Sequence, residues 1–78
     1  MSKQKVSVLE LFGNVVRSHR EALGMSQEEL AARAKLHRTY VGSVERGERN
    51  ISLKNIFLFA RALNISTGRL LTQVDDLL

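Results

Sequence analysis

The chain has 78 residues, of which 44% are hydrophobic and 26% charged, and this composition suits one small globular domain with a single core. It contains no cysteine, which excludes disulfide bonds, thiolate metal sites and thiol nucleophiles. No apolar run approaches the roughly 20 residues that a membrane span needs, and no signal-peptide pattern is present, so we expect a cytoplasmic protein. Twelve basic residues against eight acidic ones give a net charge of +4, which favours a polyanionic partner.

Apolar residues recur with helical spacing along the chain, and neither an alternating strand pattern nor a tight hairpin signal is present. The predicted fold class is therefore all-α, with five helices packed into one compact domain over residues 7–78. Residues 1–6 are expected to form a flexible N-terminus.

The first helix is predicted over about residues 7–23, closed by Gly24. Its apolar stripe consists of Val8, Phe12, Val15, Val16, His19 and Leu23. Ser26 begins a second helix, because Glu29 follows three residues later as in a capping box, and this helix ends near Lys35.

A third, short helix is predicted over about residues 38–45 and stopped by Gly47. Ser52 begins a fourth helix through Leu63, with Asn64 as its left-handed end. Ser66 begins a fifth helix that reaches about residue 77.

The second and third helices form a hairpin over about residues 27–46, joined by a turn of about three residues from Lys35 to His37. Ala31 is small where two such helices cross closely, and the residues expected to lock the pair are Leu30, Leu36, Val41 and Val44. This pattern is typical of a helix-turn-helix, whose second helix enters the DNA major groove. The outer face of the third helix is expected to be polar and basic, and consists of Arg38, Thr39, Gly42, Ser43 and Arg46.

Three motifs carry a family resemblance: Ser26-Gln27-Glu28-Glu29-Leu30-Ala31, Arg38-Thr39-Tyr40-Val41 and Val44-Glu45-Arg46-Gly47. Together they resemble the XRE (Cro/C1-type) helix-turn-helix family, over about residues 11–71. Within that family, residues 37–50 are most similar to the controller proteins of restriction–modification systems. The resemblance implies a small homodimeric regulator without a ligand domain, which binds paired operator sites and times expression of the endonuclease gene.

Two positions depart from the family pattern. Lys35 stands where the family often has glycine, and a left-handed lysine costs about 1 kcal/mol or slightly more. His37 stands where serine or aspartate often caps the third helix. Neither change touches the residues expected to face the groove.

Four residues are predicted to contact bases: Arg38, Thr39, Ser43 and Arg46. Arg38 begins the third helix, and its planar fork can donate to O6 and N7 of guanine; the alternatives are a phosphate contact or a solvated side chain. Thr39 suits a base or a phosphate equally. Gly42 either allows the helix to approach the groove or is simply tolerated.

Phosphate contacts are predicted for Gln27, Tyr40, Arg49, Asn50, Arg17 and Lys54. Gln27 lies in the first turn of the second helix, where free backbone N–H groups and the helix dipole favour an anion, and the alternative is simple capping. Tyr40 can either send its hydroxyl to a phosphate or pack into the domain. The family resemblance also implies an ion pair between Arg20 and Glu45 that sets the angle of the recognition helix.

The C-terminal third, about residues 53–78, has more apolar surface than one small core needs. We therefore predict a twofold homodimer whose interface includes Phe57, Phe59, Ile65, Leu71 and Val74. Two recognition helices would then lie about 34–36 Å apart, matching half-sites one helical turn apart. The alternative is a monomer whose fourth helix forms the centre of the core.

The sequence thus predicts a sequence-specific DNA-binding transcriptional regulator, a controller protein that binds near-palindromic operators as a dimer. Expected partners are double-stranded operator DNA, a second copy of the chain and RNA polymerase, with no membrane and no small-molecule ligand. His19 and His37 are expected to serve packing and the turn, so no metal, cofactor or enzymatic activity is predicted. The alternatives are a phage-type repressor, an antitoxin-type regulator, and a protein-interaction module that binds no nucleic acid.

Overall fold

The computed structural model describes residues 7–78, and this part of the chain contains helices and no strand. The all-α prediction is confirmed, and the predicted helix ends agree closely with the structure. The helices are α1 (Val8–Ala22), α2 (Gln27–Ala34), α3 (Arg38–Glu45), α4 (Leu53–Ala62) and α5 (Thr67–Asp76). The predicted flexible segment 1–6 lies outside the described residues.

Serine side chains cap the N-termini of four helices: α1, α2, α4 and α5. At α1 and α2 the serine hydroxyl accepts a backbone N–H while Glu10 or Glu29 accepts the N–H of the serine, which completes a capping box. The N-cap of α3 is His37, which makes no side-chain cap bond. The first backbone N–H groups of α3 therefore have no side-chain partner.

Four helix ends in residues 7–78 use a left-handed residue, and two of these residues are not glycine. Gly24 and Gly47 have φ of 70° and 76°, whereas Lys35 has φ of 59° and Asn64 has φ of 58°. At the end of α2 the N–H of Leu36 donates to the carbonyl of Ala31 at 2.9 Å, so the strained Lys35 closes the turn before α3.

Replacing Lys35 by glycine should raise the free energy of unfolding by up to about 1 kcal/mol, because glycine adopts the left-handed conformation without steric cost. Lys35→Ala is the matched control, since it removes the charge and the long side chain but keeps the Cβ. Urea denaturation would measure both variants. Equal effects of the two substitutions would show that backbone strain at Lys35 is not the cause.

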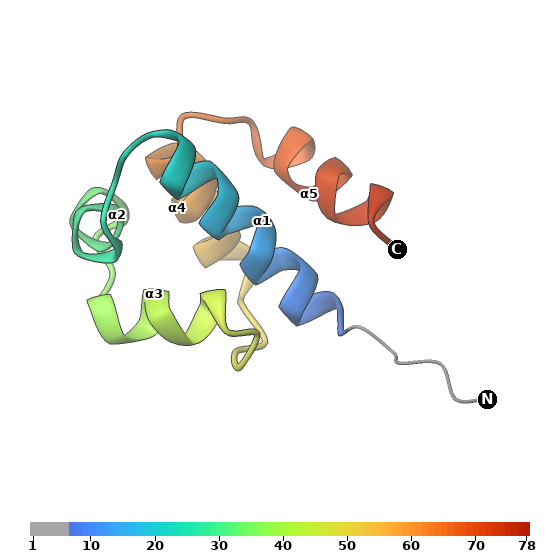
Figure 1. Ribbon diagram of the computed structural model, residues 1–78, viewed down its shortest axis with the longest axis horizontal. Coiled ribbons are helices and arrows are strands. Elements are labelled where there is room, and N and C mark those ends of the chain that lie inside the picture. The colour runs from blue at the N-terminus through green and yellow to red at the C-terminus, as the bar shows by residue number, and fades with distance from the viewer. Residues whose placement is uncertain (1–6) are drawn as a thin grey trace.

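In Figure 1, α1 crosses the middle of the molecule, with α2 and α3 on one side and α5 on the other. Helix α1 packs against α3 and α5, α2 packs against α3 and α4, and α4 also packs against α5. As a result α3 lies along one edge of the molecule, far from α5, with one face directed outward.

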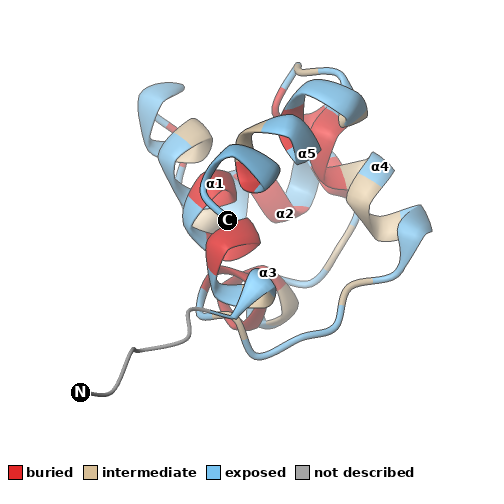
Figure 2. Cartoon of the chain, turned by 90° about the vertical axis from the view of Figure 1, so that its right-hand side faces the viewer, coloured by how far each residue is buried: buried red, intermediate tan, exposed pale blue. Residues whose placement is uncertain are grey.

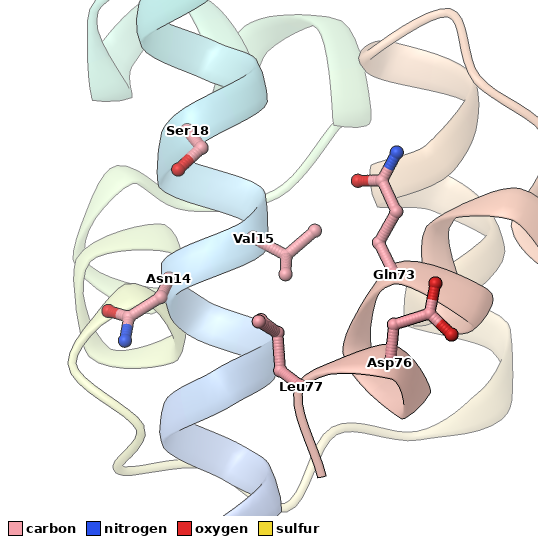
Figure 3. Close-up of a pocket in the computed structure, with 6 residues that line it drawn as sticks. All are labelled: Asn14, Val15, Ser18, Gln73, Asp76 and Leu77. Atoms are coloured by element: carbon pink, nitrogen blue, oxygen red, sulfur yellow. The ribbon is translucent and has the colours of Figure 1, made fainter.

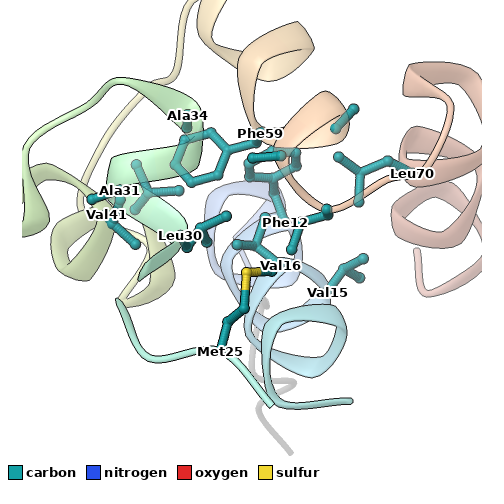
Figure 4. Packing of buried hydrophobic residues seen from close by; sticks show 14 of the residues in the cluster. Phe12, Val15, Val16, Met25, Leu30, Ala31, Ala34, Val41, Phe59 and Leu70 are labelled. Carbon is teal, nitrogen blue, oxygen red and sulfur yellow. The ribbon is translucent and has the colours of Figure 1, made fainter. Parts of the chain in front are cut away.

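The core is centred on Phe59 of α4, whose side chain is fully buried. Its ring meets that of Phe12 edge-on, with centroids 6.2 Å apart, and lies 6.4 Å from that of Tyr40. Figure 4 shows Phe12 and Phe59 among the aliphatic side chains of the other helices, including Leu30 and Leu70.

The apolar stripe predicted for α1 is wrong at its two ends. Val8 and Leu23 are 51% and 52% exposed, because they lie beyond the helices that pack against the middle of α1. His19 is only partly buried, and its Nε2 shares a hydrogen bond of 2.6 Å with Oε1 of Gln73. The prediction that His19 packs in the core is therefore wrong, and the side chain instead forms a polar link between α1 and α5.

Candidate nucleic-acid interface

The hairpin of α2 and α3 has the packing that the sequence predicts. Ala31 is 4% exposed on α2, while Val41 and Val44 are 0% and 1% exposed on α3. Leu36, in the turn, packs partly buried against the same core. The apolar back of α3 is thus held by the domain and fixes which of its faces points outward.

The close backbone contact between α1 and α3 at Gly13 was not anticipated from the sequence. A Cβ placed on Gly13 of α1 would overlap the carbonyl oxygens of Val44 and Glu45. Only glycine lets the backbone of α1 approach the end of α3 this closely. The sequence did contain a signal for this contact. Glycine lowers helix propensity, so a glycine inside an apolar helical pattern indicates that another part of the chain packs closely there.

Glu45 lies where α1, α2 and α3 meet, and its side chain is fully buried. Arg20 donates from Nε to Oε2 at 2.6 Å and from NH2 to Oε1 at 3.0 Å, and its NH1 donates to the carbonyl of Met25 at 2.9 Å. Gln27 donates from Nε2 to Oε1 of Glu45 at 3.0 Å, and Nε of Arg17 lies 3.5 Å from the same oxygen. The structure therefore contains the Arg20–Glu45 ion pair that the resemblance implies.

The charge of Glu45 depends on these donors. Burial raises its pKa, but the hydrogen bonds from Arg20 and Gln27 and the charges of Arg20 and Arg17 outweigh burial and hold the pKa below its ordinary value. The hydrogen bond to Glu45 likewise raises the pKa of Arg20. The carboxylate is therefore ionised at neutral pH and ties the C-terminal end of α3 to both neighbouring helices.

Two of the four predicted base-contacting residues lie at the exposed N-terminal end of α3. Arg38 and Thr39 are both exposed, and the second half of α3 is largely buried until Arg46. Gly42 is covered, because a Cβ there would lie 3.2 Å from NH1 of Arg46 and 3.5 Å from Oε1 of Gln27. The outer face is therefore formed by Arg38, Thr39 and the folded-back side chain of Arg46.

The expected outward position of Ser43 is wrong. Ser43 is 5% exposed, and its hydroxyl donates to the carbonyl of Tyr40 at 2.7 Å while accepting from Nε of Arg49 at 3.1 Å. It lies beside Val44 at the edge of the buried stripe, so the helix turns it toward the following loop. Ser43 therefore positions Arg49 and has no free donor for a base.

Tyr40 packs into the domain and also orders the loop. Its ring lies against Phe59, the guanidinium carbon of Arg49 lies 5.5 Å from its centroid, and its hydroxyl accepts from Nδ2 of Asn55 at 3.0 Å. Asn55 is a residue that the sequence did not single out, and its position in the first turn of α4 carries no distinct signal. The hydroxyl of Tyr40 can still donate its own hydrogen to a phosphate.

The remaining predicted phosphate residues surround α3. Asn50 and Lys54 are exposed in the loop and at the start of α4, and the side chain of Arg17 is 47% exposed beside the buried Glu45. One amide N–H of Gln27 is used by Glu45, which leaves the other for a phosphate. Arg46 forms an exposed ion pair with Glu48, whose hydrogen bonds lower the pKa of Glu48 and raise that of Arg46.

The apolar residues predicted to join two copies fall into two groups. Phe59 and Val74 are 0% and 5% exposed, so their assignment to an interface is wrong: both face the core of their own chain. Phe57 and Leu71 are 48% and 38% exposed, and Ile65 is partly buried. Leu53, one turn before Phe57 on α4, is 67% exposed and was not predicted; Figure 2 shows α4 exposed at this end and buried further along.

A groove between α1 and the end of α5 is lined by Asn14, Val15, Ser18, Gln73, Asp76 and Leu77, and Asp76 is its one ionisable side chain (Figure 3). Residues 7–78 contain no group of three or more side chains suited to holding a metal ion. None of the helices described is long and apolar enough to cross a membrane.

Comparison with known proteins places this geometry in a family. The helix-turn-helix family model matches residues 16–70. The chain belongs to this family. The control protein C.SmaI from Serratia marcescens is 47% identical over 68 residues, which cover 87% of this chain and 81% of the relative.

Two solved structures of controller proteins are also similar to this chain. The restriction–modification controller protein C.AhdI from Aeromonas hydrophila is 52% identical, with 80% of this chain and 94% of that chain covered and a TM-score of 0.77. The controller C.Esp1396I, solved as a tetramer in complex with its natural 35 base-pair operator, is 29% identical over 92% of this chain and 95% of that chain, with a TM-score of 0.83. The predicted resemblance to restriction–modification controller proteins is confirmed.

Proposed function

We propose that this chain is the controller protein of a restriction–modification system, a dimeric regulator that inserts α3 into the major groove of its operator. The observation that carries this proposal is the pair of exposed side chains, Arg38 and Thr39, at the start of a helix whose back is locked in the core. In the major groove, the edges of the bases can accept hydrogen bonds from side chains at this end of the helix. The surrounding arginine and lysine side chains can bind the phosphates on either side of the groove.

Arg38 is the base-contacting residue with the strongest chemical case. Its five N–H donors lie in a plane and match O6 and N7 of guanine, whereas Thr39 offers a methyl group to thymine and a hydroxyl to a base or phosphate. Arg46 extends the same face. The phosphate contacts fall to Arg17, Gln27, Tyr40, Arg49, Asn50 and Lys54, which surround this face on α1, α2, α3, the loop and α4.

The first test removes the guanidinium of Arg38. Selection of bound duplexes from a random pool, with the wild-type protein and with Arg38→Ala, should yield a near-palindromic consensus that loses preference at one base pair in each half-site. The lost discrimination should be about 1–3 kcal/mol per base pair, since one bidentate contact is removed. Lys54→Ala should weaken binding to all sequences about equally; an unchanged consensus with Arg38→Ala would contradict the assignment.

A second copy of the chain is expected to cover the exposed apolar side chains of α4. Leu53 and Phe57 are four residues apart, so they lie on one face of the helix, and they follow directly on the loop that holds Arg49. We expect a twofold axis through this face to bring the two copies of α3 to the same side of the dimer. Such an arrangement allows two half-sites on one face of the DNA to be bound together.

Replacing Phe57 by glutamate should weaken the dimer about 10- to 100-fold, because about half of the ring is still exposed in each chain and would be buried on association. Sedimentation equilibrium measures the dissociation constant. Leu23→Glu is the matched control, since Leu23 is 52% exposed on the far end of α1. If Leu23→Glu weakens the dimer and Phe57→Glu does not, the interface does not lie on α4.

Bound at its operator, the dimer regulates transcription by blocking RNA polymerase or by recruiting it. Footprinting the DNA upstream of its own gene, with and without polymerase, distinguishes the two. Mutual exclusion of the two footprints indicates repression, and a strengthened polymerase footprint indicates activation.

A further inference from the structure

Arg46 and Glu48 form a two-pronged ion pair on the outer surface, next to the face of α3 proposed to meet DNA. Nε of Arg46 donates to Oε2 of Glu48 at 3.0 Å, and NH2 donates to Oε1 at 3.1 Å. Both side chains are slightly more than half exposed, 54% and 55%. The carboxylate uses two of the five N–H donors of the guanidinium, so the edge formed by NH1 and the second hydrogen of NH2 remains free.

The position of Glu48 is determined by backbone hydrogen bonds. The N–H of Gly47 donates to the carbonyl of Val44 at 3.0 Å, and that of Glu48 donates to the carbonyl of Ser43 at 2.9 Å, which closes α3 with a Schellman motif. Gly47 has φ of 76°, and a Cβ there would overlap Glu10 of α1. The turn is therefore held against α1, and the carboxylate is presented to Arg46 by a rigid segment.

The free edge of Arg46 points back along α3. A Cβ at Gly42 would lie 3.2 Å from NH1 of Arg46, so the guanidinium lies over this glycine. Positions 38, 42 and 46 are four residues apart and share one face of the helix. Because Gly42 has no side chain, Arg46 can lie over it, on the same face of α3 as Arg38, and this face is the one proposed to enter the groove.

We propose that Glu48 is a positioning residue for sequence selection: it orients Arg46 so that the free edge of the guanidinium meets a guanine, and its charge discourages a phosphate contact. Guanine presents two acceptors, O6 and N7, that match this two-donor edge, and a neutral base edge is not repelled by the nearby carboxylate. A phosphate is repelled by it. This inference rests on the proposed DNA-binding function.

The test compares wild type, Glu48→Gln, Glu48→Asp, Arg46→Ala and the double variant Arg46→Ala/Glu48→Gln on two duplexes of equal length. One duplex carries the consensus selected by the wild-type protein, and the other is random. Glu48→Gln should tighten binding to random DNA about 1.5- to 5-fold per protomer, and should lower the ratio of consensus to random affinity. For Glu48→Gln on random DNA, the slope of the logarithm of affinity against the logarithm of salt concentration should steepen by about one per protomer, because Arg46 then binds a phosphate.

Glu48→Asp keeps the charge but is one methylene too short to reach both nitrogens, so it should lower the affinity ratio without tightening random binding. Glu28→Gln removes an equal charge from an exposed position in the first turn of α2 and should leave the ratio unchanged. In the Arg46→Ala background, Glu48→Gln should have no effect on the ratio. Circular dichroism confirms that each variant is folded.

Two results would overturn the inference. If Glu48→Gln changes consensus and random affinities by the same factor, its carboxylate acts only through its charge. If the change in ratio persists without Arg46, Glu48 does not act through that guanidinium. Wild-type protein that binds the selected and random duplexes equally would instead refute the proposed function, and this outcome is visible before any variant is measured.

Discussion

Raising the salt concentration from 50 to 200 mM should weaken operator binding by about 10³-fold or more. Each cation that neutralises a phosphate releases a counterion, and the logarithm of the affinity falls with a slope of about −0.9 per phosphate. Arg17, Arg49 and Lys54 give a dimer about six such cations, which accounts for a loss of about 10³-fold, and each further arginine or lysine that neutralises a phosphate increases the loss.

Fluorescence anisotropy on a labelled operator duplex, over a series of potassium chloride concentrations, measures this slope. Lys54→Gln should reduce the slope by about one per protomer. Arg61→Gln, an exposed arginine in the last turn of α4, is the control and should leave the slope unchanged. A flat salt response of the wild-type protein would exclude the phosphate contacts proposed here.

Replacing Glu45 by glutamine should lower the free energy of unfolding by about 3 kcal/mol. The substitution keeps the shape of the side chain and one acceptor but leaves the charge of Arg20 without its partner, and losing one member of a buried pair costs about 3–5 kcal/mol. The lower value is expected because the side chain of Arg20 remains 11% exposed. Urea denaturation measures the change, and Glu28→Gln, at an exposed position, should stay within about 0.5 kcal/mol of wild type.

The effect of Glu45→Gln should depend on pH. The pKa of Glu45 is lowered in the folded chain, so its contribution is fully present above the ordinary value of 4.5 and is lost as the pH falls through the lower, folded-state pKa. The difference in stability between wild type and Glu45→Gln should therefore be constant near neutral pH and shrink in acid. A difference that stays the same at low pH would mean that the ionised carboxylate is not what stabilises the three helices.

The positions of the two arginines near α3 illustrate what tertiary contacts add. A sequence can place Arg46 and Arg49 after the recognition helix, but it cannot say that Arg49 is held by Tyr40 and Ser43. Nor can it say that Arg46 is turned back over Gly42 by Glu48. Each of these contacts depends on a turn whose path is determined by packing against α1.

The sequence predicts the ends of the five helices in residues 7–78, the left-handed residue at Asn64 and the helix-turn-helix itself. Their causes are local: a serine accepts the N–H of a nearby residue, a glycine or asparagine tolerates positive φ, and apolar residues recur every three or four positions. The family motifs are contiguous in the chain for the same reason. Tertiary structure alone decided the exact rotation of α3 about its axis, and therefore that Ser43 faces the loop, whereas Arg38 and Thr39 face outward as the sequence predicts. It also decided that Phe59 fills the core while Phe57, two residues earlier, is exposed, because burial depends on which neighbouring helix covers each side of α4.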